Sequence, residues 1–141
     1  MRIYDLVRGQ EIFRADANQM VLEVVRAMVA RNIGAVPVLV DDLLVGVFSE
    51  RDLMKRVVAE GIDPRTTQVA EVMTRDPLTV SPHEDLETCR TLMKRNGFRH
   101  LPVCEGSKLT GMISMRDILL HDLDAKDEEV RMMRAYIQTA I

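Results

Sequence analysis

Two Ser-x-x-Asp motifs, Ser49 to Asp52 and Ser114 to Asp117, are the residues of this chain best placed to do chemistry. Each follows a glycine and two apolar residues, and each has an arginine directly before the aspartate. A serine with an acid three residues later is a helix capping box, which many helices carry. A helix that starts at the end of a strand also offers unpaired N–H groups to an anion. The motif therefore fits either a simple cap or a site in which the aspartate accepts hydrogen bonds from ribose hydroxyls.

The arginines, Arg51 and Arg116, extend the second interpretation, because a guanidinium can bind a phosphate through two parallel hydrogen bonds. Alternatively, both arginines are solvent-exposed residues in the first helical turn, and the sequence does not favour one interpretation over the other. A sugar, a phosphate and a flat base held between apolar strands would account for every element of the motif.

The motif belongs to an internal repeat with a constant offset of 65 residues and no gap. The matched pairs include Pro37 with Pro102, Gly46 with Gly111, Asp52 with Asp117, Met28 with Met93, and Leu44 with Leu109. A fixed period of this kind indicates two copies of one structural unit. Two such units can pack face to face and leave two equivalent clefts between them.

Each copy is predicted to contain a helix, two strands and a second helix. In the first copy these are a helix capped by Asn18, strands at 35–40 and 43–48, and a helix from Ser49 to about Glu60. In the second they are a helix from Ser81 to Asn96, strands at 101–104 and 109–113, and a helix from Ser114. Short extended segments are expected before the copies, at 11–14 and 77–80, and a short helix within 66–73.

The fold class expected is α+β, with two β-α-β-β-α repeats packed pseudo-symmetrically through their sheets. A repeat of about 50 residues cannot bury a sufficient core alone, so the two should fold together. The boundaries predicted are 1–62 for the first domain, 63–76 for a linker, 77–123 for the second domain and 124–141 for a C-terminal amphipathic helix. Its apolar stripe is Val130, Met133, Ile137 and Ile141.

Composition excludes several classes of function. The net charge of −3 argues against a general nucleic-acid grip, and no apolar run could cross a bilayer. The two cysteines, Cys89 and Cys104, are expected to be buried reduced thiols in a cytoplasmic protein. The three histidines show no metal-ligand spacing, and no catalytic triad can be assembled. We therefore expect no metal, no catalytic residues and no membrane partner.

The repeated motifs resemble a tandem pair of cystathionine-β-synthase (CBS) domains, also called a Bateman module. The residues that carry the resemblance are 33–38 with 46–52 in the first copy, and 98–103 with 111–117 in the second. The resemblance covers about residues 5 to 123, and no catalytic domain is attached, as in stand-alone CBS-pair proteins. It implies a homodimer and an adenosine-containing ligand in one or both clefts. That ligand would be AMP, ADP or ATP, with NAD or S-adenosylmethionine as further options.

The resemblance also implies roles for individual residues. Asp52 and Asp117 would hold ribose hydroxyls, and Ser49 and Ser114 would bond to ribose or phosphate. Thr79 and Ser81 flank the extended strand that enters the second repeat, and the resemblance implies that they contact the ligand. The motif prolines Pro37 and Pro102 are also implied in binding. Arg99 and His100 would reach the phosphate. The first copy has Gly34 and Ala35 in place of the last two, so the second copy's cleft is expected to be the better nucleotide site.

Three functions are compatible with these observations. The leading one is a regulatory module that senses an adenine nucleotide and changes its dimer geometry or the activity of a partner protein. The alternative is a dimerisation or partner-interaction scaffold without a ligand, in which both aspartates only cap helices. An enzyme has no support beyond a possible nucleotide site.

Overall fold

The first repeat is built on a β-hairpin whose turn requires unusual backbone angles. The valine-rich strand β2 (Ala35–Val40) pairs antiparallel with β3 (Leu43–Ser49). Asp41 and Asp42 connect them, with φ of 48° and 67°. Two positive φ angles in a two-residue loop give the turn whose twist matches paired strands, and aspartate tolerates them better than most residues.

The second repeat forms the same hairpin 65 residues later. Strand β5 (His100–Glu105) pairs with β6 (Lys108–Ser114), and all strand positions of β5 between its two ends are buried. All four predicted strands are confirmed, each extended by at most one residue at either end. The structure is a computed structural model that describes residues 1–139.

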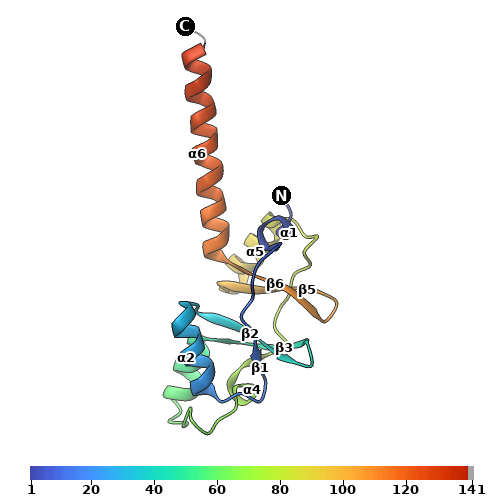
Figure 1. Cartoon of the computed structure of the whole chain (residues 1–141), viewed down its shortest axis with the longest axis vertical. Coiled ribbons are helices and arrows are strands. Elements are labelled where there is room, and N and C mark those ends of the chain that lie inside the picture. The colour runs from blue at the N-terminus through green and yellow to red at the C-terminus, as the bar shows by residue number, and fades with distance from the viewer. Residues whose placement is uncertain (140–141) are drawn as a thin grey trace.

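The two hairpins lie one above the other and meet where Leu43 of β3 pairs with Lys108 of β6 (Figure 1). The sheet order is β1-β2-β3-β6-β5, with β4 pairing on β3. At the junction Leu39, Cys104 and Leu109 are buried in one cluster. The α+β arrangement of two repeats joined through their strands therefore agrees with the expectation from the sequence.

The first helix of each repeat begins later than predicted, and the predicted end of the second copy's helix at Asn96 is confirmed. Helix α2 (Val21–Arg31) ends at Asn32 in the left-handed region, and α5 (Leu86–Asn96) ends at Gly97 with φ of 69°. The starts at Asn18 and Ser81 are wrong. The N-cap of α2 is Met20, and Asp85 caps α5 by accepting a hydrogen bond from the N–H of Thr88. Ser81 instead accepts one from His83 in the turn before the helix.

Each repeat borrows a segment that precedes the other repeat in the chain. Helix α1 (Ile3–Val7), which was not predicted, buries Ile3 and Val7 in the core of the second repeat. Helix α4 (Val69–Val72), within the predicted segment 66–73, packs in the core of the first. The exchange interlocks the two halves. Two-residue strands β1 (Ala15–Asp16) and β4 (Thr74–Arg75) follow these helices.

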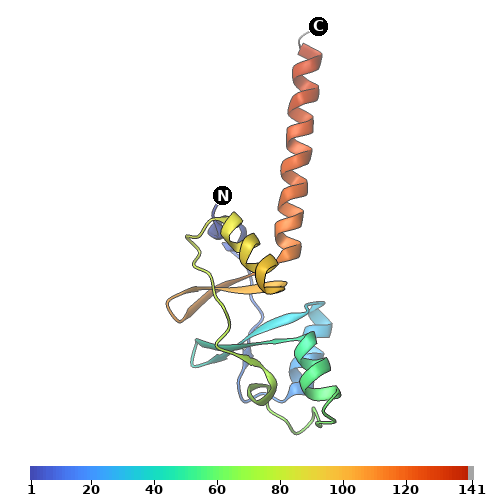
Figure 2. The same ribbon diagram turned by 180° about the vertical axis from the view of Figure 1, so that it is seen from behind.

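The helix after each Ser-x-x-Asp motif differs between the repeats. In the first, α3 (Glu50–Asp52) continues as the π-helical segment η1 (Leu53–Val58). In the second, α6 (Met115–Thr139) runs for 25 residues as one helix across residues 123 and 124, and it projects far from the sheet (Figures 1 and 2). Arg90 of α5 anchors the N-terminal part of α6 by donating two hydrogen bonds to the Asp122 carboxylate. The predicted stripe residue Ile141 lies outside the described residues.

Both cysteines are buried and unpaired, as predicted. Burial raises the pKa of the Cys89 thiol to about 11, so the thiol stays protonated and unreactive at neutral pH. Within residues 1–139, no helix combines the length and the apolar character needed to cross a membrane.

Candidate functional site

A groove of about 980 Å³ lies between the two repeats. Its walls come from the segment 10–13, the end of α2, the starts of β2 and β5, and the junction of β6 with α6. Its apolar lining includes Phe13, Ile33, Pro37, Met112 and Leu120. Both repeats therefore contribute, which is the arrangement expected for a cleft between two pseudo-symmetric units.

The groove brings together half of the predicted binding residues. Those that line it are Asp117, Ser114, Arg116, Arg99, His100 and Pro37. The other six lie outside its lining, namely Asp52, Ser49, Arg51, Pro102, Thr79 and Ser81. The first set includes all the residues expected to make the second copy's cleft the better site.

Asp117 is half-buried and only partly engaged. Its Oδ2 accepts a hydrogen bond from the Ser114 backbone N–H over 2.9 Å, while its own N–H donates to Ser114 Oγ over 3.1 Å. These two bonds form the predicted capping box. Its Oδ1 has no hydrogen-bond partner within the described part of the chain. A carboxylate that lines a groove and is fixed through one oxygen only is suited to accept hydroxyl hydrogen bonds from a ligand.

Asp52 occupies the matching position but is 6% exposed and fully engaged. Its Oδ2 accepts hydrogen bonds from the Ser49 N–H and hydroxyl, over 2.9 and 3.1 Å. Its Oδ1 accepts one from the Thr74 hydroxyl over 3.1 Å and lies 3.7 Å from Arg56 Nε. A ligand could reach this carboxylate only by breaking contacts within the protein. The two copies of the motif are therefore not equivalent.

The starts of α3 and α6 are bonded to the residues that directly precede β2 and β5. The N–H of Glu50 donates to the Gly34 carbonyl over 2.9 Å, and the N–H of Met115 donates to the Arg99 carbonyl over 2.8 Å. All four residues line the groove. These matching bonds fix both helix starts against the groove wall.

His100 lies half-buried in the groove, and burial is the main reason why its pKa is lowered. The carboxylates of Asp117 and Glu50 act in the opposite direction, and Arg99 adds to the lowering. The imidazole is therefore neutral near pH 7 and can both donate and accept a hydrogen bond.

The groove floor depends on Gln10, which the sequence did not single out. Its side-chain amide donates to the Met112 carbonyl and accepts from the Met112 N–H, both over 3.0 Å, as a neighbouring strand would. Beside it, Gly111 leaves room for α1, because a Cβ at this position would lie 2.8 Å from Val7 Cβ. The extended segment predicted at 11–14 was the only signal that could have pointed to this wall.

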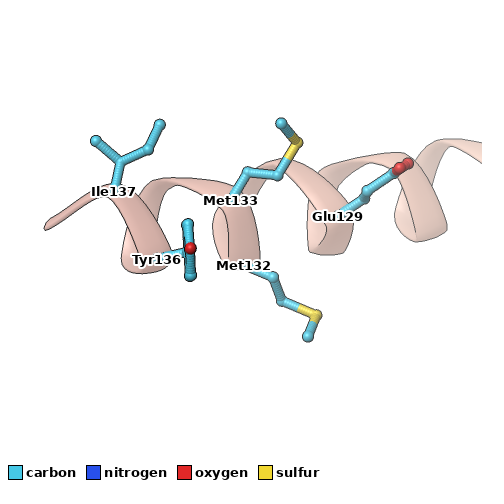
Figure 3. Close-up of a pocket in the computed structure, with 5 residues that line it drawn as sticks. All are labelled: Glu129, Met132, Met133, Tyr136 and Ile137. Atoms are coloured by element: carbon cyan, nitrogen blue, oxygen red, sulfur yellow. The ribbon is translucent and has the colours of Figure 1, made fainter. Parts of the chain in front are cut away.

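A second candidate surface is a shallow, mainly apolar patch near the end of α6. Its lining is Glu129, Met132, Met133, Tyr136 and Ile137, all from the same helix (Figure 3). Because no other element of residues 1–139 contributes to its lining, the patch lacks the enclosure of a small-molecule site. Residues 1–139 contain no group of three or more side chains that could hold a metal ion.

Comparisons with known proteins agree with the fold and the repeat. The model of the CBS domain matches residues 6–59 and 69–124. Over 123 residues the chain is 30% identical to the mitochondrial CBS domain-containing protein CBSX3 of Arabidopsis thaliana, covering 84% of this chain and 60% of that protein. It is 29% identical over 113 residues to the CBS domain-containing protein YhcV of Bacillus subtilis, covering 80% of each.

Two solved structures extend the comparison. A CBS-domain containing protein from Agrobacterium tumefaciens superposes with a TM-score of 0.79 at 28% identity, covering 86% of this chain and 99% of that one. CBSX2, solved in complex with AMP, superposes with a TM-score of 0.77 at 26% identity, covering 89% and 98%. The predicted tandem pair is thus confirmed, and this chain belongs to the CBS domain family.

Proposed function

We propose that this protein is a regulatory module that binds one adenosine-containing nucleotide per chain, in the groove beside Asp117. The observation that carries the proposal is the difference between the two aspartates. Asp117 lines the groove and has one carboxylate oxygen without a hydrogen-bond partner within residues 1–139, whereas Asp52 is buried and bonded to Thr74. The AMP complex of CBSX2 supports the ligand class.

The groove offers the groups that each part of such a ligand requires. Asp117 would accept hydrogen bonds from the ribose hydroxyls, and Ser114 would form a hydrogen bond to the ribose or the phosphate. Arg99 and Arg116 would meet the phosphate, with His100 as a neutral hydrogen-bonding partner. The adenine would lie among apolar side chains near Pro37. We expect binding without turnover.

A homodimer and a cytoplasmic location are further parts of the proposal. The dimer rests on the family resemblance, and the location on two buried thiols that form no disulfide. A nucleotide would act as a signal only through the difference between its affinities for two states of the dimer or of a regulated partner protein.

The ligand-free scaffold remains the competing function, and the projecting helix favours it. Helix α6 exposes Leu123, Met132, Met133 and Ile137, each more than half accessible. Thermal unfolding of nucleotide-free protein with AMP, ADP and ATP separates the two. Ligand at 100 times its dissociation constant adds about 2.7 kcal/mol of stability. A raised midpoint with at least one nucleotide supports the sensor, and an unchanged midpoint with all of them supports the scaffold.

A further inference from the structure

The groove is not a cationic site, although it has two arginines. Its charged side chains are the acids Glu11, Glu50 and Asp117 and the bases Arg99 and Arg116. His100 adds no positive charge near pH 7, because burial lowers its pKa. Three carboxylates therefore face two guanidiniums. A site of this composition cannot neutralise a highly charged anion.

Glu50 is an exposed carboxylate of this wall whose backbone is fixed at the start of α3. It is the first residue of α3, and its N–H is bonded to the Gly34 carbonyl over 2.9 Å. Its side chain folds across Gly34, so that a Cβ at residue 34 would lie 3.2 Å from Glu50 Oε1. The matching positions in the second repeat are Met115 and Arg99. The first repeat thus presents a negative charge where the second presents an apolar side chain.

Glu50 also lies close to the residues proposed to hold the ligand. Its carboxylate and that of Asp117 act electrostatically on the same imidazole, His100. Glu50 accepts no side-chain hydrogen bond and forms no ion pair within residues 1–139. Its charge is therefore uncompensated by a bonded cation and acts on whatever occupies the groove.

Building on the proposed function, we propose that Glu50 is a specificity-determining residue that restricts the groove to adenosine carrying one phosphate or none. A single phosphate can be met by Arg99 and Arg116. Each additional phosphate brings a further negative charge toward a wall that holds Glu50 and Glu11. Glu50 and Glu11 are exposed, so this repulsion acts partly through water and salt weakens it.

Calorimetric titration of nucleotide-free protein with adenosine, AMP, ADP and ATP tests this inference. The buffer contains EDTA, so that magnesium does not mask the phosphate charge. We expect AMP to bind at least tenfold more tightly than ATP at low salt, with ADP between them. The ratio should fall as the salt concentration rises.

The variant Glu50→Gln keeps the size of the side chain and removes its charge. This variant should reduce the ratio of AMP affinity to ATP affinity at least threefold, chiefly by strengthening ATP binding. The matched control is Glu60→Gln, because Glu60 is exposed and does not line the groove. This control should leave the ratio unchanged.

The outcomes separate this inference from the function on which it rests. If no adenosine ligand binds, the proposed function fails and the inference fails with it. If ATP binds as tightly as AMP, the nucleotide site stands and the restriction is wrong. If AMP is preferred but Glu50→Gln leaves the ratio intact, the role of Glu50 is overturned.

Discussion

Thr74 donates its hydroxyl to Oδ1 of Asp52 over 3.1 Å, closing the first copy of the motif with a contact from within the chain. Within residues 1–139 the second copy has no such contact, and the position 65 residues before Thr74 is Gly9, which has no side chain to offer. Arg56, which adds a charge beside Asp52, is likewise replaced by His121. Small differences between the repeats thus leave one aspartate open and close the other.

The variant Asp117→Ala should remove nucleotide binding at little cost in stability. The lost capping box contributes about 1 kcal/mol to the free energy of unfolding. Loss of charge-assisted hydrogen bonds to ribose should weaken AMP binding at least tenfold. Calorimetry measures the affinity and urea unfolding the stability. Unchanged affinity would show that this aspartate is only a helix cap.

The matched variant Asp52→Ala should have the opposite pattern. Asp52 is buried, and its removal leaves Thr74 and the Ser49 N–H without their partner. Hydrogen bonds to a charged group contribute about 1.5–3 kcal/mol each, and Asp52 accepts them from both Ser49 and Thr74, so this variant should unfold at clearly lower urea concentration than Asp117→Ala. Its affinity for AMP, measured while it is still folded, should stay within about twofold of the parent. A large loss of affinity would place the nucleotide in the first cleft.

The variant Gly111→Ala should destabilise the interlocked fold. A Cβ there would lie 2.8 Å from Val7 Cβ, so helix α1 must shift away from β6. Overpacking of this kind costs about 1–3 kcal/mol, measured as a lower unfolding midpoint. Gly34→Ala is the control, because its Cβ would meet only the flexible end of Glu50. Equal effects of the two substitutions would argue against tight packing of α1 on β6.

His100 should make stability depend on pH. Burial lowers its pKa in the folded protein below the ordinary value of about 6.5, so the unfolded chain binds the proton more readily. The free energy of unfolding should therefore rise with pH between the folded-state pKa and about 6.5, and fall as the solution is acidified through that window. Urea unfolding at pH 5 and pH 7.5 should show a smaller difference in His100→Gln than in the parent. An identical difference would exclude this residue as the cause.

The repeat made most of the fold predictable. The 65-residue offset, the valine-rich run before Asp41 and the glycine at residue 97 specified hairpins and helix ends through local rules. The helix starts could not be predicted as well, because Ser81 and Asp85 are both plausible caps of α5 by residue type, and only packing selects Asp85. The exchange of α1 and α4 between the repeats was also hidden, since a short helix has little periodicity of its own.

The site could be predicted only by residue type. The motif identified both aspartates equally, and the difference between them arises from contacts with distant segments, such as Thr74 on Asp52. The sequence favoured the second cleft through Arg99 and His100, which do line the groove with Asp117. Glu50 and Gln10 were missed, because a glutamate at a helix start and a glutamine in an extended segment are unremarkable until the chain has folded.

The most direct test of the proposed function is a crystal structure of the protein grown with AMP. We expect one nucleotide per chain, with its ribose hydroxyls within hydrogen-bonding distance of Asp117 Oδ1 and with Asp52 still bonded to Thr74. Electron density for AMP against Asp52, or none in the groove at saturating AMP, would contradict the account.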